Sequence, residues 1–358
     1  MFTYIFNFVV LLFLTLIHYT LKFDKKAAFF MKTIVFIFLL FFIGLRHEVG
    51  GDWYGYLLWY KRIQSEGLSF SIDSILLRDF GYNFINWMSE KLGFGIYGVN
   101  TFCGFLFLIG LFRLLKQLGN DRRFYLGLLI SYPYLIMVVA NGYTRQATAL
   151  GLVMLSYSFL LERSFKKSFL FQILALFFHK SSVVGFVSFL LGTKKLLNKY
   201  VVITAGAIIL LSLILMPVFE RFYTFYVENP MISEGGTLRG LMNMIPSLVY
   251  ILFYRYFRIK YKDSWFWLRI SLIAFILSGI SILKFTFADR LLLYFSCIQF
   301  VTLTRLENVL KEIEVKSLVF LTIIFVYALS LIIWLLFAVH APRWLPYQNI
   351  LLIQLTKQ

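Results

Sequence analysis

The sequence predicts an all-α polytopic membrane protein, a bundle of about twelve transmembrane helices. Of its 358 residues, 60% are hydrophobic and only 15% are charged, whereas soluble domains are nearer half apolar and a quarter charged. At about 20 residues per spanning helix, twelve helices use about 240 residues and leave mostly short loops. We therefore expect one integral-membrane domain over residues 1–358 and no independent soluble domain.

Apolar runs predict the spans in order along the chain. They cover residues 2–21, 29–45, 95–115, 124–141, 144–161, 168–179, 181–193, 200–219, 240–257, 265–283, 290–304 and 317–339. The two runs beside His179 are short for full spans, so a tilted or re-entrant hairpin is expected there. The first run lacks the basic start and cleavage site of a removable signal peptide and is expected to stay as an anchor. Two long loops, 46–94 and 220–239, share one face.

Basic residues alternate between successive loops and so predict the orientation. The loops of one face hold 21 Lys or Arg and those of the other face hold 13. Because basic residues mark the cytoplasmic side, both termini are expected outside. This topology accounts for the formal net charge of +18. Membrane lipids are therefore predicted partners, and nucleic acid is not.

The two faces also differ in their choice of basic residue. The cytoplasmic loops use 14 Lys and 7 Arg, while the outer loops use 5 Lys and 8 Arg. Arg carries a planar fork that grips phosphate or carboxylate with two hydrogen bonds. Counts this small allow chance as an explanation, and binding of discrete anions at the outer face is the alternative.

The outer loop 46–94 begins with the polar and aromatic segment RHEVGGDWYGYLLWYKR. Its two adjacent glycines permit a tight turn. Aromatic and apolar residues then recur at helical spacing in two segments, which predicts two helices lying in the membrane interface. These residues are Trp53, Tyr56, Leu57 and Tyr60, and then Leu76, Phe80, Phe84, Trp87 and Met88. An aromatic belt that only anchors the protein is the competing interpretation.

Five outer helix ends carry a basic residue beside polar ones. They are Arg46, Arg145, His179 with Lys180, Arg239, and Asp289 with Arg290. Snorkelling to lipid headgroups explains any single one, but five on one face favour convergence on an anionic ligand. His179 is either a hydrogen-bonded turn residue or a phosphate donor or proton-transfer group.

Several classes of site are missing from the sequence. It contains no P-loop, dinucleotide fingerprint, HExxH motif or nucleophile elbow. The other histidines, His18, His47 and His340, are far apart in sequence, so no zinc site is predicted. No carboxylate falls in the middle of a predicted span, which lowers the support for an ion-coupled transporter.

Four short segments resemble the EpsG-like branch of the Wzy-type polysaccharide polymerases. They are Gly44-Leu45-Arg46 through Gly51-Asp52-Trp53 and Tyr56, Arg145-Gln146-Ala147, Phe178-His179-Lys180-Ser181, and Asp289-Arg290 with Tyr294-Phe295. Trp53 stands where Tyr is more usual in that family. The resemblance covers nearly the whole chain, but its motifs are short and degenerate.

The resemblance implies a polysaccharide polymerase of the bacterial inner membrane, multi-pass, with its active site facing the periplasm and a bundle related to the GT-C glycosyltransferases. It would transfer a growing glycan from undecaprenyl diphosphate to the non-reducing end of a new lipid-linked repeat unit. No metal or other cofactor is implied. The implied partners are undecaprenyl-diphosphate-linked oligosaccharide as donor and acceptor, a chain-length regulator and a flippase.

On this hypothesis the outer residues take three roles. Arg145 and Arg290 bind the diphosphate, with Arg46 and Lys180 in support, because guanidinium forks stabilise charge on a leaving group. Asp52 is the first candidate for the base that removes the acceptor proton, followed by Glu48 and His179. Asp52 is equally expected as a structural partner of Arg46. Sugar binding is assigned to Trp53, Tyr56 and Tyr143.

Two related functions remain open: a flippase for the same lipid-linked oligosaccharide, and a periplasmic ligase that transfers finished chains. A flippase is expected to line a central cavity with charge, but only Arg269 lies well inside a predicted span. A membrane O-acyltransferase would need His or Cys at the cytoplasmic face, where only His18 stands. A purely structural anchor does not account for twelve spans with arginines at their ends.

Overall fold

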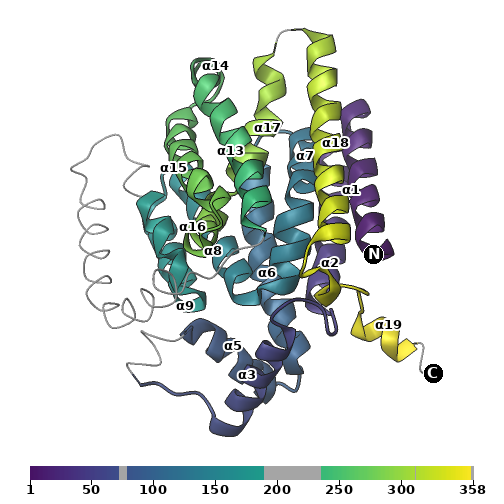
Figure 1. Cartoon of the computed structure of the whole chain (residues 1–358), viewed down its shortest axis with the longest axis vertical. Helices are drawn as coiled ribbons and strands as arrows, with labels where there is room; N and C mark the ends of the chain where they lie inside the picture. The colour runs from purple at the N-terminus through teal and green to yellow at the C-terminus, as the bar shows by residue number, and fades with distance from the viewer. Residues whose placement is uncertain (72–78, 189–234, 311, 356–358) are drawn as a thin grey trace.

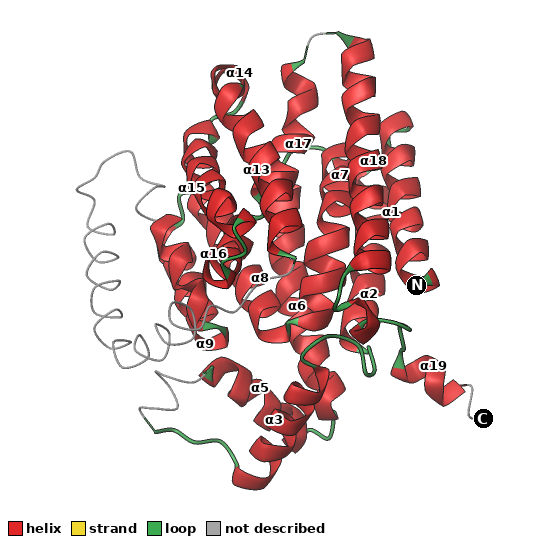
Figure 2. Cartoon of the chain, viewed as in Figure 1, coloured by secondary structure: helices red, strands yellow, loops and turns green. Residues whose placement is uncertain are grey.

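The computed structural model describes residues 1–71, 79–188, 235–310 and 312–355. Throughout this part the regular elements are helices, as Figure 2 shows. Long helices run side by side as a bundle, and two shorter helices, α3 and α5, lie across one end of it (Figure 1). Both chain termini lie toward the same end, which we call the α3–α5 end. The all-α prediction is confirmed.

The first half of the chain contains α1 (Phe2–Thr20), α2 (Lys25–Gly44), α3 (Trp53–Glu66), α5 (Phe80–Lys91), α6 (Gly95–Lys116), α7 (Asp121–Ser131), the π-helix η1 (Tyr132–Ala140), α8 (Thr144–Leu161), α9 (Phe165–Phe178) and the 3-10 helix η2 (Lys180–Phe186). The second half contains α13 (Gly236–Leu252), α14 (Tyr254–Lys260), α15 (Ser264–Ile282), α16 (Thr286–Leu292), η4 (Leu293–Phe295), α17 (Ile298–Val309), α18 (Ile313–Phe337), η5 (Ala341–Arg343) and α19 (Ile350–Leu355).

Six helices of the described part are long and apolar enough to cross a membrane. They are α1, α2, α6, α7 continued by η1, α15 and α18. Two further pairs qualify only when joined across a bend: α13 with α14, bent by 72°, and α16–η4 with α17, bent by 46°. The chain is therefore a multi-pass membrane protein with six to eight candidate spans in its described part.

The remaining predicted spans have separate outcomes. The run 144–161 is α8, which is helical but is not among the six to eight candidates. The run 168–179 falls in the 14-residue α9, and 181–193 begins within η2. The run 200–219 and most of the loop 220–239 lie outside the described residues. The count of twelve spans stays a prediction.

Helix α6 packs closely against α2 and α8 through small residues. A Cβ atom added at Gly110 of α6 would lie only 1.9 Å from the carbonyl oxygen of Gly151 in α8. On its other side, one added at Gly104 would lie 2.9 Å from Ile43 of α2. Small residues let helix backbones approach closely and gain dispersion contacts where lipid supplies no hydrophobic drive. Of these three helices, α6 and α8 lie mostly inside the bundle, whereas only a third of α2 is buried.

The two helices predicted in the loop 46–94 are present as α3 and α5. Their buried residues include Trp53 and Tyr56 from α3 and Tyr82 and Ile85 from α5. Tyr56 and Tyr82 pack with ring centroids 5.5 Å apart, which joins the two helices. Leu76, the first residue of the second predicted segment, lies outside the described residues.

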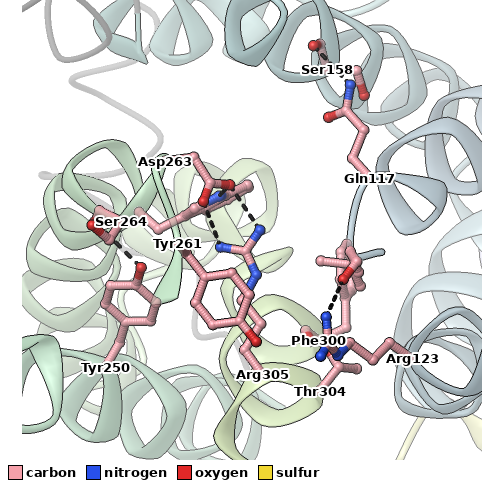
Figure 3. A network of polar contacts seen from close by, with 12 residues as sticks. Gln117, Arg123, Ser158, Tyr250, Tyr261, Asp263, Ser264, Phe300, Thr304 and Arg305 are labelled. Carbon is pink, nitrogen blue, oxygen red and sulfur yellow. Dashed lines mark hydrogen bonds and ion pairs between the residues drawn. The ribbon is translucent and has the colours of Figure 1, made fainter. Parts of the chain in front are cut away.

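The opposite end of the bundle is held by ion pairs. Arg305 of α17 donates two hydrogen bonds, of 3.0 and 2.8 Å, to Asp263 before α15, and its guanidinium lies over Tyr261 (Figure 3). Arg122 of α7 pairs with Glu307 of α17 at 2.8 Å. Because the two partners of each pair come from different segments of the chain, these contacts fix how α7, α15 and α17 meet at this end.

Candidate functional site

Arg145, Asp79 and His179 meet at the α3–α5 end of the bundle. Arg145 lies in the first turn of α8, and its Nη1 donates to Oδ2 of Asp79 at 2.7 Å. Asp79 directly precedes α5 and is only 7% exposed. His179, between α9 and η2, places Nδ1 3.6 Å from the same oxygen, beyond hydrogen-bond length. Three segments far apart in sequence thus converge on one buried carboxylate.

The charges around Asp79 keep it ionised. Burial raises its pKa, but His179, Arg145 and Lys180 together outweigh burial and hold the pKa below the ordinary value of 3.8. The Nε2 atom of His179 lies 3.3 Å from the amide nitrogen of Gln146. This contact leaves the Nδ1 atom, with its proton, to face Asp79, an assignment inferred from the partners.

Two aromatic rings support the other faces of Arg145. The guanidinium carbon lies 5.6 Å from the ring centroid of Tyr56 and 5.5 Å from that of Trp59. Trp59 is fixed in turn, because its Nε1 donates to Asn83 of α5 at 2.7 Å. The Arg145 side chain is still 29% exposed, so its fork is oriented by the protein and remains within reach of a ligand.

A second arginine–aspartate pair joins α13 to α16. Arg239 donates from Nε and Nη2 to the two oxygens of Asp289, at 2.8 and 2.6 Å. Its guanidinium lies 5.8 Å from the ring centroid of Tyr134 in η1. Arg290 follows Asp289 directly and is exposed. The two-bond geometry orients Arg239 as a bidentate fork.

Asp52 and Tyr143 link the two pairs into one region. Asp52 keeps solvent contact, yet desolvation by its surroundings raises its pKa, against the opposing charges of Arg145, Arg290, Arg343 and His179. Asp52 precedes α3 without capping it through its side chain. Burial raises the pKa of Tyr143, and the charges of Asp52, Arg239, Asp289 and Arg290 also act on this hydroxyl group.

The two pairs, together with the charges that act on Asp52, Asp79 and Tyr143, define the cationic cluster, whose charged members are Arg145, Lys180, Arg239, Arg290, Arg343, Asp52, Asp79 and Asp289. Five basic groups against three carboxylates give these eight residues a net charge of +2. A site of this kind offers several oriented donors to an anion.

Arg46 and Glu48 lie apart from these pairs. Arg46 is 1% exposed and donates to the Ile43 carbonyl, to Asn100 and to Thr144, at 2.6, 3.0 and 2.7 Å. It therefore ties α2 to α6 and to the residue before Arg145. Glu48 is exposed, has a left-handed φ of 52°, and lies 4.0 Å from His47.

The three residues predicted to bind sugar differ in exposure. Trp53 is 4% exposed and packs against His47 and Tyr97, with ring centroids 5.8 and 6.3 Å apart. Tyr56 is 6% exposed, beneath Arg145. Tyr143 is half-buried. Stacking on a sugar needs an open ring face, so the geometry favours Tyr143 over Trp53 and Tyr56.

The segment after α18 closes over the segments that carry Asp52 and Arg145. Trp344 is 1% exposed; its Nε1 donates to the Met137 carbonyl at 3.1 Å. A Cβ atom added at Gly142 would lie 2.1 Å from its indole, and one added at Gly51 would lie 3.3 Å away. The Gly50 amide donates to the Arg343 carbonyl at 2.8 Å. One indole thus fixes the backbone beside both residues.

The sequence did not single out three members of this arrangement: Asp79, Arg343 and Trp344. Asp79 precedes a predicted interfacial helix, where an aspartate normally reads as a helix cap, but here its side chain makes no cap hydrogen bond. Arg343 and Trp344 lie beyond the last predicted span, 200 residues from Tyr143 and Thr144. Among the described residues no group of three His, Cys, Asp or Glu is arranged to hold a metal ion.

The class of protein follows from a match to a known family. A family model described as the EpsG family matches residues 29–349, which is most of the chain. The chain belongs to the EpsG family. The matched range includes every residue of the cationic cluster, and membership of the EpsG family points to a role in exopolysaccharide biosynthesis. No curated protein and no solved structure matches the chain.

Proposed function

We propose that this EpsG-family protein is a polysaccharide polymerase of the bacterial inner membrane. It transfers a growing glycan from undecaprenyl diphosphate to the non-reducing end of a new lipid-linked repeat unit, at the periplasmic face. The observation that carries the proposal is the cationic cluster, in which carboxylates orient Arg145 and Arg239 in the same region as the exposed Asp52 and the partly buried His179. The proposal includes twelve spans and a bundle related to the GT-C glycosyltransferases.

The arginines serve the leaving group. When the bond between the anomeric carbon and the phosphate oxygen breaks, negative charge grows on the diphosphate. Arg145 and Arg290 stabilise that charge, with Lys180 beside them. Oriented donors at a low-dielectric boundary contribute roughly 3 kcal/mol each to such a transition state. Arg46, which is buried, supports the site by holding Thr144, the neighbour of Arg145.

Asp52 is the first candidate for the base. The acceptor hydroxyl must lose its proton as its oxygen attacks the anomeric carbon, and the base must lie within hydrogen-bond reach of it. Asp52 keeps solvent contact among the arginines, whereas Asp79 is engaged with Arg145. His179, with its proton directed toward Asp79, is the second candidate. Glu48 stays a weaker third, because it lies beside His47.

Reconstituted activity tests the proposal. The purified protein in liposomes would receive undecaprenyl-diphosphate-linked repeat units from the host strain, without nucleotide or metal, and the glycans would be separated on a gel. Wild-type protein is expected to yield a ladder of added repeats. Arg145→Ala and Arg290→Ala are each expected to lower its rate by roughly 100-fold or more, the loss usual for one such donor.

Arg62→Ala is the matched control, because Arg62 belongs to α3 but forms only an exposed pair with Glu66. A full ladder in both cluster variants would overturn the diphosphate assignment. Unextended units that cross the bilayer would instead identify a flippase. Transfer of finished chains to another acceptor would identify a ligase.

A further inference from the structure

A cavity of about 210 Å³ lies between η1, α13 and α18. Its walls are mainly apolar, and they include Val138 of η1, Met242 of α13, and Ile333 and Phe337 of α18. Pockets that enclose a whole drug-sized ligand usually measure about 300–1,000 Å³. This cavity is therefore suited to one part of a larger apolar chain.

The cavity is continuous with the cationic cluster. Arg239 and Tyr143 line it, and both also belong to the polar region, Arg239 through its pair with Asp289 and Tyr143 through its proximity to Asp52 and Arg290. A ligand that fits both parts has an anionic head and an apolar tail. The polar end supplies the charge complementarity that a purely apolar groove lacks.

The walls of the cavity are held in place by buried contacts. Gln299 of α17 donates to Asn243 of α13 at 3.0 Å and accepts from Tyr327 of α18 at 2.8 Å. These bonds join three helices behind the lining residues. On the third side, the π-helix η1 presents Pro133, Tyr134 and Val138. Since π-helical turns occur frequently at functional sites, η1 is an independent sign that this space is used.

We propose that this cavity binds the isoprenoid units of the lipid carrier that lie next to its diphosphate. The choice of carrier rests on the proposed function; the fit to an amphipathic anion rests on the cavity and its polar end. With the tail between η1, α13 and α18, the diphosphate emerges beside Arg239 and faces Arg290. The tail would then orient the reacting head as well as anchor the substrate.

Filling the cavity tests this proposal. In Met242→Trp and Ile333→Trp a bulky ring would occupy the space, whereas Leu241→Trp and Ile332→Trp add the same ring at neighbouring positions that are 40% and 45% exposed and do not line the cavity. Binding of radiolabelled undecaprenyl diphosphate, which carries no sugar, would be measured on each detergent-purified variant. We expect the cavity variants to bind at least about tenfold more weakly, because an overpacked space rejects the chain.

Two competitors give the test its specificity. If the loss concerns the isoprenoid chain, inorganic diphosphate should displace the radiolabelled ligand equally well from all variants. Phosphatidylglycerol should bind to the cavity variants as tightly as it binds to the control variants. Unchanged undecaprenyl diphosphate binding in Met242→Trp and Ile333→Trp would overturn the proposal. An equal loss for phosphatidylglycerol would also overturn it, in favour of an ordinary bilayer-lipid site. Selective loss of binding without any glycan ladder from wild-type protein would reject the proposed polymerase and retain the lipid site.

Discussion

Asp79 and Asp52 both precede a helix, yet their surroundings give them different properties. Asp79 is buried, contacts Arg145 and has a lowered pKa, while Asp52 keeps solvent contact and has a raised pKa. Asp79 is a charge held in place by its neighbours, whereas the carboxyl group of Asp52 stays open to solvent and can accept a proton. At the residue scale, this difference separates a positioning carboxylate from a candidate base.

Replacing Asp79 tests its positioning role. Asp79→Asn keeps the size of the side chain but leaves Arg145 without its charged partner, so we expect a loss of about 1–3 kcal/mol of stability, less than for a fully buried pair because Arg145 is partly exposed. Thermal unfolding in detergent measures the loss. Glu66→Gln is the control, since its exposed pair with Arg62 should contribute less than about 1 kcal/mol. Equal melting of both variants would contradict the role.

The pH dependence tests Asp52. As the base it must be deprotonated, so the polymerisation rate should fall as the pH drops through a value above its ordinary pKa of 3.8. The raised pKa also affects stability. Because the folded state binds this proton more tightly than the unfolded state does, ionisation of Asp52 lowers the free energy of unfolding at neutral pH. Asp52→Asn should therefore lose polymerisation and melt no lower than wild type. A fully active Asp52→Asn protein would remove Asp52 as the base.

At the element scale, local patterns predicted the helices well and their partners poorly. The aromatic spacing after Asp52 correctly predicted α3, because interfacial helices repeat their apolar face every three or four residues. The same spacing carries no information on which charges meet. Arg145 and Asp79 are 66 residues apart, and only the packing of α5 against α6 and α9 brings them together. Arg46 shows a second limit of the sequence. A basic residue at the end of a span is predicted to bind a ligand, but Arg46 is buried.

The segment after α18 offers an element-scale prediction. Gly142→Ala would place a methyl group 2.1 Å from the Trp344 indole, an overlap that should cost about 1–3 kcal/mol of stability and displace the segment carrying Arg145. The temperature of thermal unfolding and the polymerisation rate should both fall. Adding Trp344→Phe, which supplies a smaller ring, should restore part of each.

Gly55→Ala provides the control for this substitution. No heavy atom lies within 4 Å of a Cβ atom added at Gly55 in α3, and alanine favours a helix over glycine, so this variant should be at least as stable as wild type. Wild-type behaviour of Gly142→Ala would contradict a role for Trp344 in positioning the segment before α8.

At the scale of the whole molecule, the two ends of the bundle differ in how their charged residues are arranged. The α3–α5 end carries the cationic cluster, whereas basic residues at the opposite end are engaged in pairs such as Arg305–Asp263, Arg122–Glu307 and Arg113–Glu162. The loops at that opposite end are the Lys-rich ones, and basic loops remain in the cytoplasm. The cationic cluster is therefore expected to face the periplasm.

Labelling of single cysteines tests this orientation of the whole protein. The native Cys103 and Cys297 are 1% and 0% exposed, so they should react little in intact cells and leave a low background. Ser65→Cys lies on an exposed position of α3, and Lys166→Cys lies on an exposed position near the start of α9, beside the opposite end. A membrane-impermeant maleimide applied to spheroplasts should label Ser65→Cys alone, and Lys166→Cys should react only after the membrane is permeabilised. Labelling of Lys166→Cys from outside would invert the topology and place the cationic cluster in the cytoplasm, where a periplasmic polymerase has no substrate.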